Sequence, residues 1–327
     1  MQGLPIAGAA LKTGRGTTID MAIDVHAHYY PCELVEEFAA IGSRMAALVK
    51  KAPAADLTLD ERFQLLDQTG IDLQVLSVGI LAPDFVERAA AIRSAHLAND
   101  LYAAICRSHP KRFAAFGALP LPHTDAAIDE MRRCVDDLGM LGFTLGCSVA
   151  GRPLDDPDYA PLFAELDRRE AVLLLHPVGG VTGPFTTDFG LPFMIGAVFE
   201  DTIAALRLVL SGMTVRYPRI RVIVPHLGGT LPFLLERLEL YVDLERRNGA
   251  IPFAGTVRDQ LRRLWYDTVN LHPAALSCAI DSFGADRLVL GTDFPFMTRA
   301  GFCSCVTYLA SAPQAIYERN ARALMRI

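Results

Sequence analysis

Met-Ala-Ile-Asp-Val-His-Ala-His, residues 21–28, is an apolar run that ends in two histidines, and it decides the fold. Seven more short apolar or β-branched runs follow, at residues 72–78, 113–120, 141–147, 171–177, 221–227, 264–269 and 287–293. Several are continuously hydrophobic, which is typical of parallel strands buried on both faces. Segments with helical patterns separate them, so the sequence predicts strand–helix alternation repeated eight times.

This alternation favours a single closed (β/α)8 TIM barrel, of class α/β, over two domains, because the composition does not change along the chain. The alternative is a doubly wound open sheet, which usually carries a glycine-rich phosphate turn after its first strand. Here the first strand runs into His-Ala-His-Tyr-Tyr-Pro instead, and the pair Gly228-Gly229 is too short for a phosphate loop. We expect the barrel domain at residues 21–327 and an N-terminal arm at residues 1–20.

Some helix ends can be located from their capping residues. Thr58 and Glu61 have the spacing of a capping box, and Gly70 is a stop signal, so a helix is predicted between them. Asp84 is expected to begin a longer helix, and another helix is expected over residues 201–215.

The composition excludes several classes of protein. Of the 327 residues, 51% are hydrophobic and 21% are charged, which excludes a disordered chain and allows a large core. The net charge of −6 and the lack of a long basic run argue against a nucleic-acid or anionic-membrane partner. Charged residues interrupt the most apolar stretch, so no membrane span is expected. The seven scattered cysteines are expected to be reduced thiols of a cytoplasmic protein.

Five side chains capable of metal or acid–base chemistry stand at or just past the ends of predicted strands. They are His26 and His28 in the first strand, His176 in the fifth, His226 in the sixth and Asp293 in the eighth. In a barrel the carboxyl ends of all strands open on one rim, where active sites lie. Because alternate residues of a strand share a side, both histidines of the first strand can face the barrel mouth. Paired imidazoles suit Zn²⁺ or a similar ion better than Ca²⁺ or Mg²⁺, and His176 with Asp293 would complete a site that keeps an open position.

Four segments of the chain resemble a known family. They read DVHAHYYP (24–31), LLHP (174–177), PRIRVIVPHLGGTLPF (218–233) and LVLGTDFPF (288–296). In this order they resemble the amidohydrolase superfamily, and within it the branch of metal-dependent nonoxidative decarboxylases typified by aminocarboxymuconate-semialdehyde decarboxylase. The first motif alone is weakly specific, whereas the ordered set is strongly specific.

The resemblance implies a role for each rim residue. His26, His28, His176 and Asp293 would bind one divalent metal ion, with Zn²⁺ expected and Mn²⁺ as the alternative. His226 would be the acid/base catalyst beside the ion, and Asp293 would also take part in catalysis. Many hydrolases of the superfamily carry a carboxylated lysine at the end of the fourth strand, where it bridges two metal ions. The fourth predicted strand has no lysine here, which argues for one ion and against a binuclear hydrolase.

Two arginines are candidates for binding a substrate carboxylate, because the planar guanidinium group matches that shape. Arg44 lies in the segment after the first strand, which covers the site in the family. Arg237 lies eleven residues after His226 and matches a family arginine that reaches the site of the neighbouring subunit. The resemblance therefore also implies a homodimer or a higher homo-oligomer.

The reaction expected from these features is the loss of CO₂ from an unsaturated or aromatic carboxylic acid, such as an aminocarboxymuconate-semialdehyde or hydroxybenzoate-like substrate. The alternative keeps one metal ion and the same histidine but hydrolyses a lactone or amide, or hydrates an unsaturated dicarboxylate. A barrel that serves only as a binding or structural module is a third hypothesis, and the complete set of metal ligands argues against it. The sequence does not identify the substrate.

Overall fold

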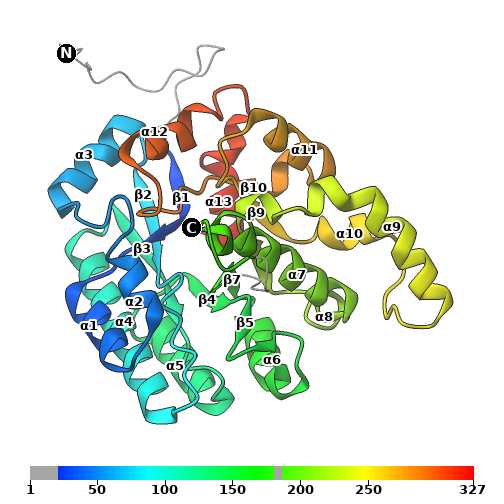
Figure 1. Ribbon diagram of the computed structural model, residues 1–327, viewed down its shortest axis with the longest axis horizontal. Helices are drawn as coiled ribbons and strands as arrows, with labels where there is room; N and C mark the ends of the chain where they lie inside the picture. The colour runs from blue at the N-terminus through cyan, green and yellow to red at the C-terminus, as the bar shows by residue number, and fades with distance from the viewer. Residues whose placement is uncertain (1–20, 180–185) are drawn as a thin grey trace.

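The computed structural model describes residues 21–179 and 186–327, and it confirms the predicted barrel. Eight parallel strands pair in the order β1-β2-β3-β4-β7-β8-β9-β10, and helices surround them (Figure 1). The strands are β1 (Ile23–His28), β2 (Leu73–Ser77), β3 (Phe113–Ala118), β4 (Gly142–Gly146), β7 (Val172–His176), β8 (Arg221–Val224), β9 (Trp265–Asp267) and β10 (Leu288–Val289). Each falls inside one of the eight runs predicted from the sequence. The arm expected at residues 1–20 lies outside the described residues.

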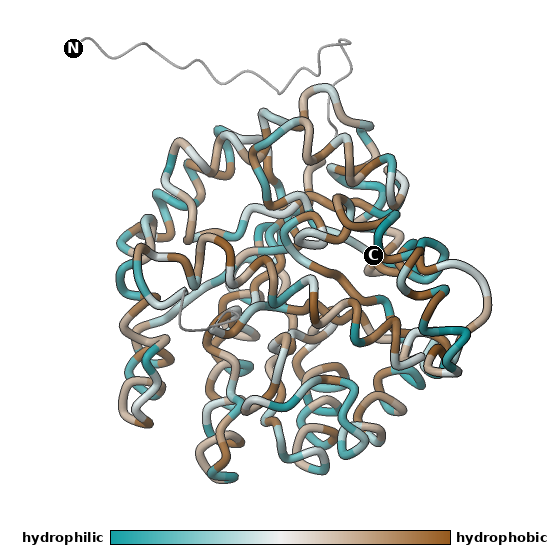
Figure 2. Tube along the Cα trace, turned by 45° about the vertical axis from the view of Figure 1, so that its right-hand side comes forward, coloured by the Kyte–Doolittle hydropathy of each residue, from teal (hydrophilic) through white to brown (hydrophobic). Residues whose placement is uncertain are grey.

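Helices connect the strands on the outside of the barrel. They are α1 (Cys32–Ala40), α2 (Arg44–Val49), α3 (Leu59–Thr69), α4 (Arg88–Ser108), α5 (Thr124–Asp136), α6 (Ala160–Arg168), α7 (Ala197–Leu210), α8 (Met213–Arg216), α9 (Leu231–Arg247), α10 (Val257–Leu261), α11 (Pro273–Phe283), α12 (Arg299–Thr307) and α13 (Arg319–Met325). Figure 2 shows hydrophobic and hydrophilic residues alternating along these helices, as expected when one side faces the sheet and the other faces solvent. Within residues 21–179 and 186–327, no helix is both long enough and apolar enough to cross a membrane.

Capping explains where the predicted helices begin and end. α3 has the complete capping box of Thr58 and Glu61 and ends at a left-handed glycine, as predicted. The prediction that Asp84 begins the next helix is wrong. Glu87 caps α4 by accepting two backbone N–H groups, whereas the Asp84 carboxylate accepts a backbone N–H from a distant loop. The helix expected over residues 201–215 is divided into α7 and α8 by Gly212, which has a φ of 77°.

The barrel closes between its first and last strands. The Val25 N–H donates to the Leu290 carbonyl at 2.9 Å, and Ala27 forms an isolated parallel bridge with Phe294. Since β10 is only two residues long, the segment that follows it supplies part of the closing wall. This pairing carries the residues just after β10 to the carboxyl rim.

Apolar side chains fill the amino-terminal half of the barrel interior. The C-terminal helix α13 packs Leu324 and Met325 against this interior cluster and closes that end. A larger core lies between the strands and the surrounding helices. The inward-facing members of the interior cluster are Ile23, Val25, Val75, Phe116, Val172, Leu174, Ile223, Trp265 and Val289. The polar side chains described below lie at the opposite, carboxyl end.

An irregularity in β1 determines which of its side chains face the interior. Val25 belongs to the interior cluster, whereas Ala27 packs in the outer core. Strict alternation from Val25 would therefore turn His26 and His28 outwards. The register of β1 against β2 shifts after Asp24, as in a β-bulge, and both histidines face the barrel mouth.

The Asp24 carboxylate stabilises this irregularity. It accepts hydrogen bonds from the His26 N–H at 3.1 Å, from the Thr292 N–H at 3.1 Å and hydroxyl at 2.6 Å, and from the Gln74 amide at 2.7 Å. Arg62 of α3 donates in turn to the Gln74 side-chain oxygen. Burial raises the pKa of Asp24 to about 6 in spite of these bonds. The network joins β1, β2 and the segment after β10 directly behind the rim.

Candidate metal centre

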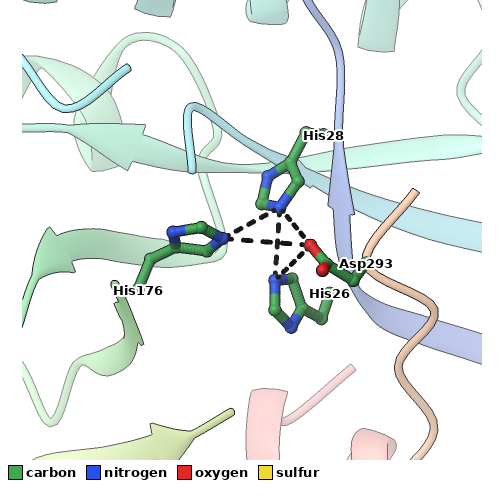
Figure 3. Close-up of side chains that lie close together, drawn as sticks. All are labelled: His26, His28, His176 and Asp293. Carbon is green, nitrogen blue, oxygen red and sulfur yellow. Dashed lines mark hydrogen bonds and ion pairs between the residues drawn. The ribbon is translucent and has the colours of Figure 1, made fainter. Parts of the chain in front are cut away.

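Four side chains converge at the carboxyl rim. One ligand atom from each of His26, His28, His176 and Asp293 lies within 4.8 Å of all the others. Figure 3 shows the three imidazoles and the carboxylate pointing toward a common centre from β1, β7 and the segment after β10. The Nε2 of His28 lies 3.2 Å from the Nε2 of His26, 3.1 Å from that of His176 and 3.1 Å from Asp293 Oδ1. Asp293 Oδ1 lies 3.4 Å from His26 Nε2 and 4.0 Å from His176 Nε2.

These separations fit a single bound ion. Zinc–nitrogen bonds of about 2.1 Å at tetrahedral angles place neighbouring donor atoms roughly 3.4 Å apart. The five distances given above, from 3.1 Å to 4.0 Å, lie on both sides of that value. The three imidazoles are at most 3% exposed, whereas the Asp293 side chain is 14% exposed, so the centre is open on the side of the carboxylate. Three nitrogens and one oxygen form a donor set that suits Zn²⁺.

Each imidazole is also held in the tautomer that metal binding requires. When Nδ1–H donates to an acceptor, the lone pair of Nε2 is left free for an ion. All three Nε2 atoms face the common centre, and all three Nδ1 atoms face away from it. The Nδ1 partners are Asp267 Oδ2 at 2.5 Å for His26, the Ser77 carbonyl at 3.1 Å and hydroxyl at 3.0 Å for His28, and the Pro177 carbonyl at 2.8 Å for His176.

The protonation of these groups follows from burial and from their partners. Burial lowers the pKa of His28 to about 3 and also lowers the pKa of His176, so both imidazoles are neutral. Burial would lower the pKa of His26 as well, but the Asp267 carboxylate outweighs it and raises that pKa. Burial would raise the pKa of Asp293, yet hydrogen bonds from the surrounding imidazoles hold it well below its usual value. A neutral imidazole and an ionised carboxylate are the forms that bind a metal ion.

His226 lies beside the four donors and forms a pair with a second carboxylate. Its Nδ1 is 2.7 Å from Asp201 Oδ2, and its Nε2 is 3.7 Å from Asp293 Oδ2. Burial would lower the pKa of His226, but the carboxylates of Asp201 and Asp293 outweigh it and raise the pKa well above its usual value. Asp293 therefore directs one oxygen toward the three imidazoles and the other toward His226.

The backbone is strained at His226, at its neighbour Leu227 and at Asp293. His226, Leu227 and Asp293 each have a φ of 55°, in the left-handed region that costs a residue with a side chain about 1–2 kcal/mol. Hydrogen bonds hold this geometry, since the His226 N–H donates to Asp267 Oδ1 and the Asp293 N–H donates to the His26 carbonyl, both at 2.8 Å. Such strain concentrates at functional sites, where the surrounding contacts maintain it.

The two predicted arginines lie apart from this cluster. Arg44 is the first residue of α2 and is exposed. Arg237 is exposed on α9, where its guanidinium lies 4.7 Å from the ring centroid of Tyr241. Within the described ranges, no hydrogen bond or ion pair joins either arginine to the four donors or to His226.

Two carboxylates of the site were missed by the sequence analysis. Asp267 ends β9 and bonds both the His26 ring and the His226 backbone. A charged residue inside the apolar run at 264–269 is a signal that could have identified it, by the same argument that identified Asp293. Asp201 lies in α7 behind His226, and no local pattern distinguishes it from the many acidic residues near helix starts.

The site can be compared with known proteins. The chain matches a family model described as amidohydrolase over residues 23–327. It is 31% identical over 238 residues to a 2-amino-3-carboxymuconate-6-semialdehyde decarboxylase of Dictyostelium discoideum, covering 72% of this chain and 66% of that protein. It is 33% identical over 290 residues to a gamma-resorcylate decarboxylase of Rhizobium sp. (strain MTP-10005), covering 82% of this chain and 87% of that protein. A crystal structure of 2,6-dihydroxybenzoate decarboxylase complexed with 2,6-dihydroxybenzoate superposes with a TM-score of 0.81 at 27% identity, covering 94% of this chain and 99% of that one.

Proposed function

The chain belongs to the amidohydrolase family, and on this premise we propose that it is a metal-dependent nonoxidative decarboxylase of an aromatic or unsaturated carboxylic acid. The observation that carries the proposal is the placement of Asp293, which directs one oxygen toward three imidazoles and the other toward His226. A metal centre and an acid/base histidine thus share one carboxylate. The similar proteins support the reaction type, since their names describe decarboxylases of a dihydroxybenzoate, of gamma-resorcylate and of an aminocarboxymuconate semialdehyde.

We propose that His26, His28, His176 and Asp293 bind one divalent ion, Zn²⁺ in the first instance and Mn²⁺ as the alternative. The distances and the three fixed tautomers support this assignment. When bound, the ion supplies a Lewis acid that orients and polarises the oxygen atoms of a substrate. Elemental analysis of the purified protein tests the assignment, and a value far below one ion per chain in active protein would contradict it.

The role proposed for His226 follows from what decarboxylation requires. Loss of CO₂ breaks the bond between the carboxylate carbon and the ring or alkene carbon, and the electron pair stays on the latter until a proton takes it. A proton donor beside that carbon avoids a free carbanion. Because its Nδ1 is tied to Asp201, His226 presents Nε2 toward Asp293 and the site, where it can hand over this proton. Asp293 Oδ2, 3.7 Å from His226 Nε2, can orient the imidazole and relay its proton.

Arg237 and the surface around it support the proposal of a homodimer. Phe233, Leu240, Tyr241 and Leu244 lie four residues before and three, four and seven residues after Arg237, so all five share one face of α9. Phe233 is 86% exposed and Leu240 is 70% exposed. An exposed apolar stripe of this kind marks an interaction surface. We propose that a second copy of the chain covers it and that Arg237 reaches the substrate carboxylate in the partner's site, whereas Arg44 contacts the carboxylate within its own chain.

Mixed dimers test the position of Arg237 directly. Arg237→Ala and His226→Ala should each be inactive alone. After subunit exchange, a dimer with one chain of each kind has one intact site, because the His226→Ala chain lends its Arg237 to the other chain. Recovery of activity on mixing is the expected result. Failure to recover activity when mass analysis shows exchanged dimers, or full activity in a monomer, would contradict the arrangement across the interface.

We also propose that the protein works in the cytoplasm. The free thiols of its seven cysteines support a reducing compartment. Fractionation of the source cells checks this, and recovery of the protein outside the cytoplasm would contradict it.

A panel of acids tests the reaction. Purified protein loaded with Zn²⁺ or Mn²⁺ is incubated with hydroxybenzoates and a muconate semialdehyde, and both CO₂ and the product with C–H in place of C–COOH are measured. The expected result is equal amounts of the two. Hydrolysis of a lactone or amide, or hydration of an unsaturated dicarboxylate, would instead incorporate ¹⁸O from labelled water into the product without CO₂. That outcome would replace the proposal with the hydrolase or hydratase alternative.

A further inference from the structure

A fully buried carboxylate stands behind His226. Asp201 of α7 is 0% exposed, and its Oδ2 lies 2.7 Å from His226 Nδ1. Its other oxygen lies 3.4 Å from the Cys147 thiol, which follows β4. A buried carboxylate is unfavourable unless hydrogen bonds compensate it, and Asp201 directs both oxygens at such partners.

The hydrogen bond from His226 to Asp201 determines which ring nitrogen of neutral His226 carries the proton. A neutral imidazole carries one proton, and an ionised carboxylate only accepts hydrogen bonds. The Asp201 partner therefore holds the proton of neutral His226 on Nδ1 and leaves the lone pair of Nε2 toward Asp293 and the site. This is the arrangement in which an acid/base imidazole exchanges a proton through one fixed nitrogen.

The local backbone is built to allow this contact. Gly229, three residues after His226, has a φ of 64°, and a Cβ added there would lie 2.3 Å from Thr202 Oγ1 and 2.4 Å from the Val198 carbonyl. α7 can approach the turn because residue 229 is a glycine. Thr202, the neighbour of Asp201, then accepts the Thr230 N–H at 2.9 Å and fixes the helix to the turn.

The thiol partner links this pair to the end of the fourth strand. Cys147 directly follows β4. Here the Cys147 N–H donates to the His176 carbonyl at 2.9 Å, and its thiol donates to Asp201. The end of β4 therefore supports the pair of His226 and Asp201.

We infer that Asp201 is a positioning residue of the proposed decarboxylase, which fixes the tautomer and the orientation of His226 so that proton transfer runs through Nε2. The inference rests on the proposed function for its effect on turnover. Asp201 acts through His226: within the described residues, no hydrogen bond or ion pair joins it to His26, His28, His176 or Asp293.

Asp201→Asn tests this inference, with Asp155→Asn as the matched control. Asp155 bonds Arg207 of the same helix but not His226, so it reports on any general disturbance of α7. In zinc-loaded protein, Asp201→Asn should lower kcat by about 100-fold or more, within the range that acid–base catalysis contributes. KM, zinc content and the unfolding midpoint should stay close to wild type. An unchanged kcat would overturn the inference, as would a loss of kcat fully matched by loss of zinc or by the control.

Nitrogen-15 NMR of the imidazoles keeps the test independent of turnover. The His226 signals are assigned by their absence in His226→Gln. At a pH where His226 is neutral, the proton of the wild-type ring should lie on Nδ1, and in Asp201→Asn, whose amide can donate to Nδ1, it should move to Nε2. If wild type releases no CO₂ from any acid, the proposed function fails, but this spectrum still decides the role of Asp201. If Asp201→Asn does not fold, Asp201→Glu replaces it and should keep the Nδ1 proton while losing part of kcat; wild-type kcat in that variant would overturn the inference.

Discussion

Asp267 makes the most informative single target, because one carboxylate orients groups in both halves of the site. Its Oδ2 accepts the His26 ring proton at 2.5 Å, and its Oδ1 accepts the backbone N–H groups of His226 at 2.8 Å and Val269 at 2.9 Å. All three partners are donors, and Asp267 is 0% exposed. Asp267→Asn keeps the size of the side chain but replaces one acceptor by an NH₂ donor.

The orientation of the new amide decides whether Asp267→Asn loses metal affinity or folding stability. With NH₂ toward His26, the ring must carry its proton on Nε2, which then has to be released before an ion can bind. Loss of such an orienting partner weakens metal affinity by about 10–100-fold, equivalent to about 1.4–2.7 kcal/mol. With NH₂ toward the backbone, two buried N–H groups lose their acceptor, at about 1–3 kcal/mol each. Either orientation predicts a measurable loss.

Competition with a chromophoric chelator measures the zinc affinity, and urea unfolding of the same samples measures stability. Asp286→Asn is the control, since Asp286 precedes β10, is exposed and forms a 3.6 Å ion pair with the half-buried Arg287. We expect weaker zinc binding, lower stability or both in Asp267→Asn, and wild-type values in the control. If Asp267→Asn matched wild type in both measurements, the reasoning that carboxylate acceptors fix the ligand tautomers would be refuted.

Three further predictions can be checked with the same preparations. His176→Ala should lose its zinc in elemental analysis, because it removes one of four donors, whereas His226→Ala should keep zinc and lose turnover; the reverse pattern would exchange their roles. Gly229→Ala should lose about 2–5 kcal/mol in urea unfolding, because a left-handed alanine would also meet Thr202 at 2.3 Å, and unchanged stability would contradict this. Burial raises the pKa of Asp84 from 3.8 to about 6, so the folded state binds its proton more tightly than the unfolded state does. The Asp84 contribution to stability should therefore fall as pH rises from about 4 to 6, and unfolding curves of Asp84→Asn should lack that part of the decline.

The barrel was predictable because its strands are recognisable locally. A parallel strand buried on both faces is a short continuous apolar run, and each of the eight runs became a strand. Contacts between distant segments were not predictable in this way. Asp84 looked like a helix start, but its carboxylate accepts the Ala150 N–H across 66 positions, and Glu87 caps the helix instead.

The candidate site shows the same division. The convergence of the rim residues followed from their positions at strand ends, and the structure brings His26, His28, His176 and Asp293 together. The carboxylates behind them depend on packing between elements, and nothing in the sequence near Asp201 shows that α7 lies against the turn of His226. The proposed contribution of Arg237 depends on the position of a second chain, and the sequence pattern of one chain does not predict that position.

The shift of register in β1 makes the two ends of the barrel independent of each other. Before the shift, alternate residues of β1 pack into the interior apolar cluster. After it, the opposite set of alternate residues faces the barrel mouth and includes both imidazoles. A change that made β1 alternate regularly without removing a residue would turn both histidines toward the helices, whereas deleting one residue at the bulge would keep them facing the barrel mouth. Conversely, residues at the carboxyl rim can be substituted to support a different chemistry without repacking the apolar cluster in the amino-terminal half of the barrel.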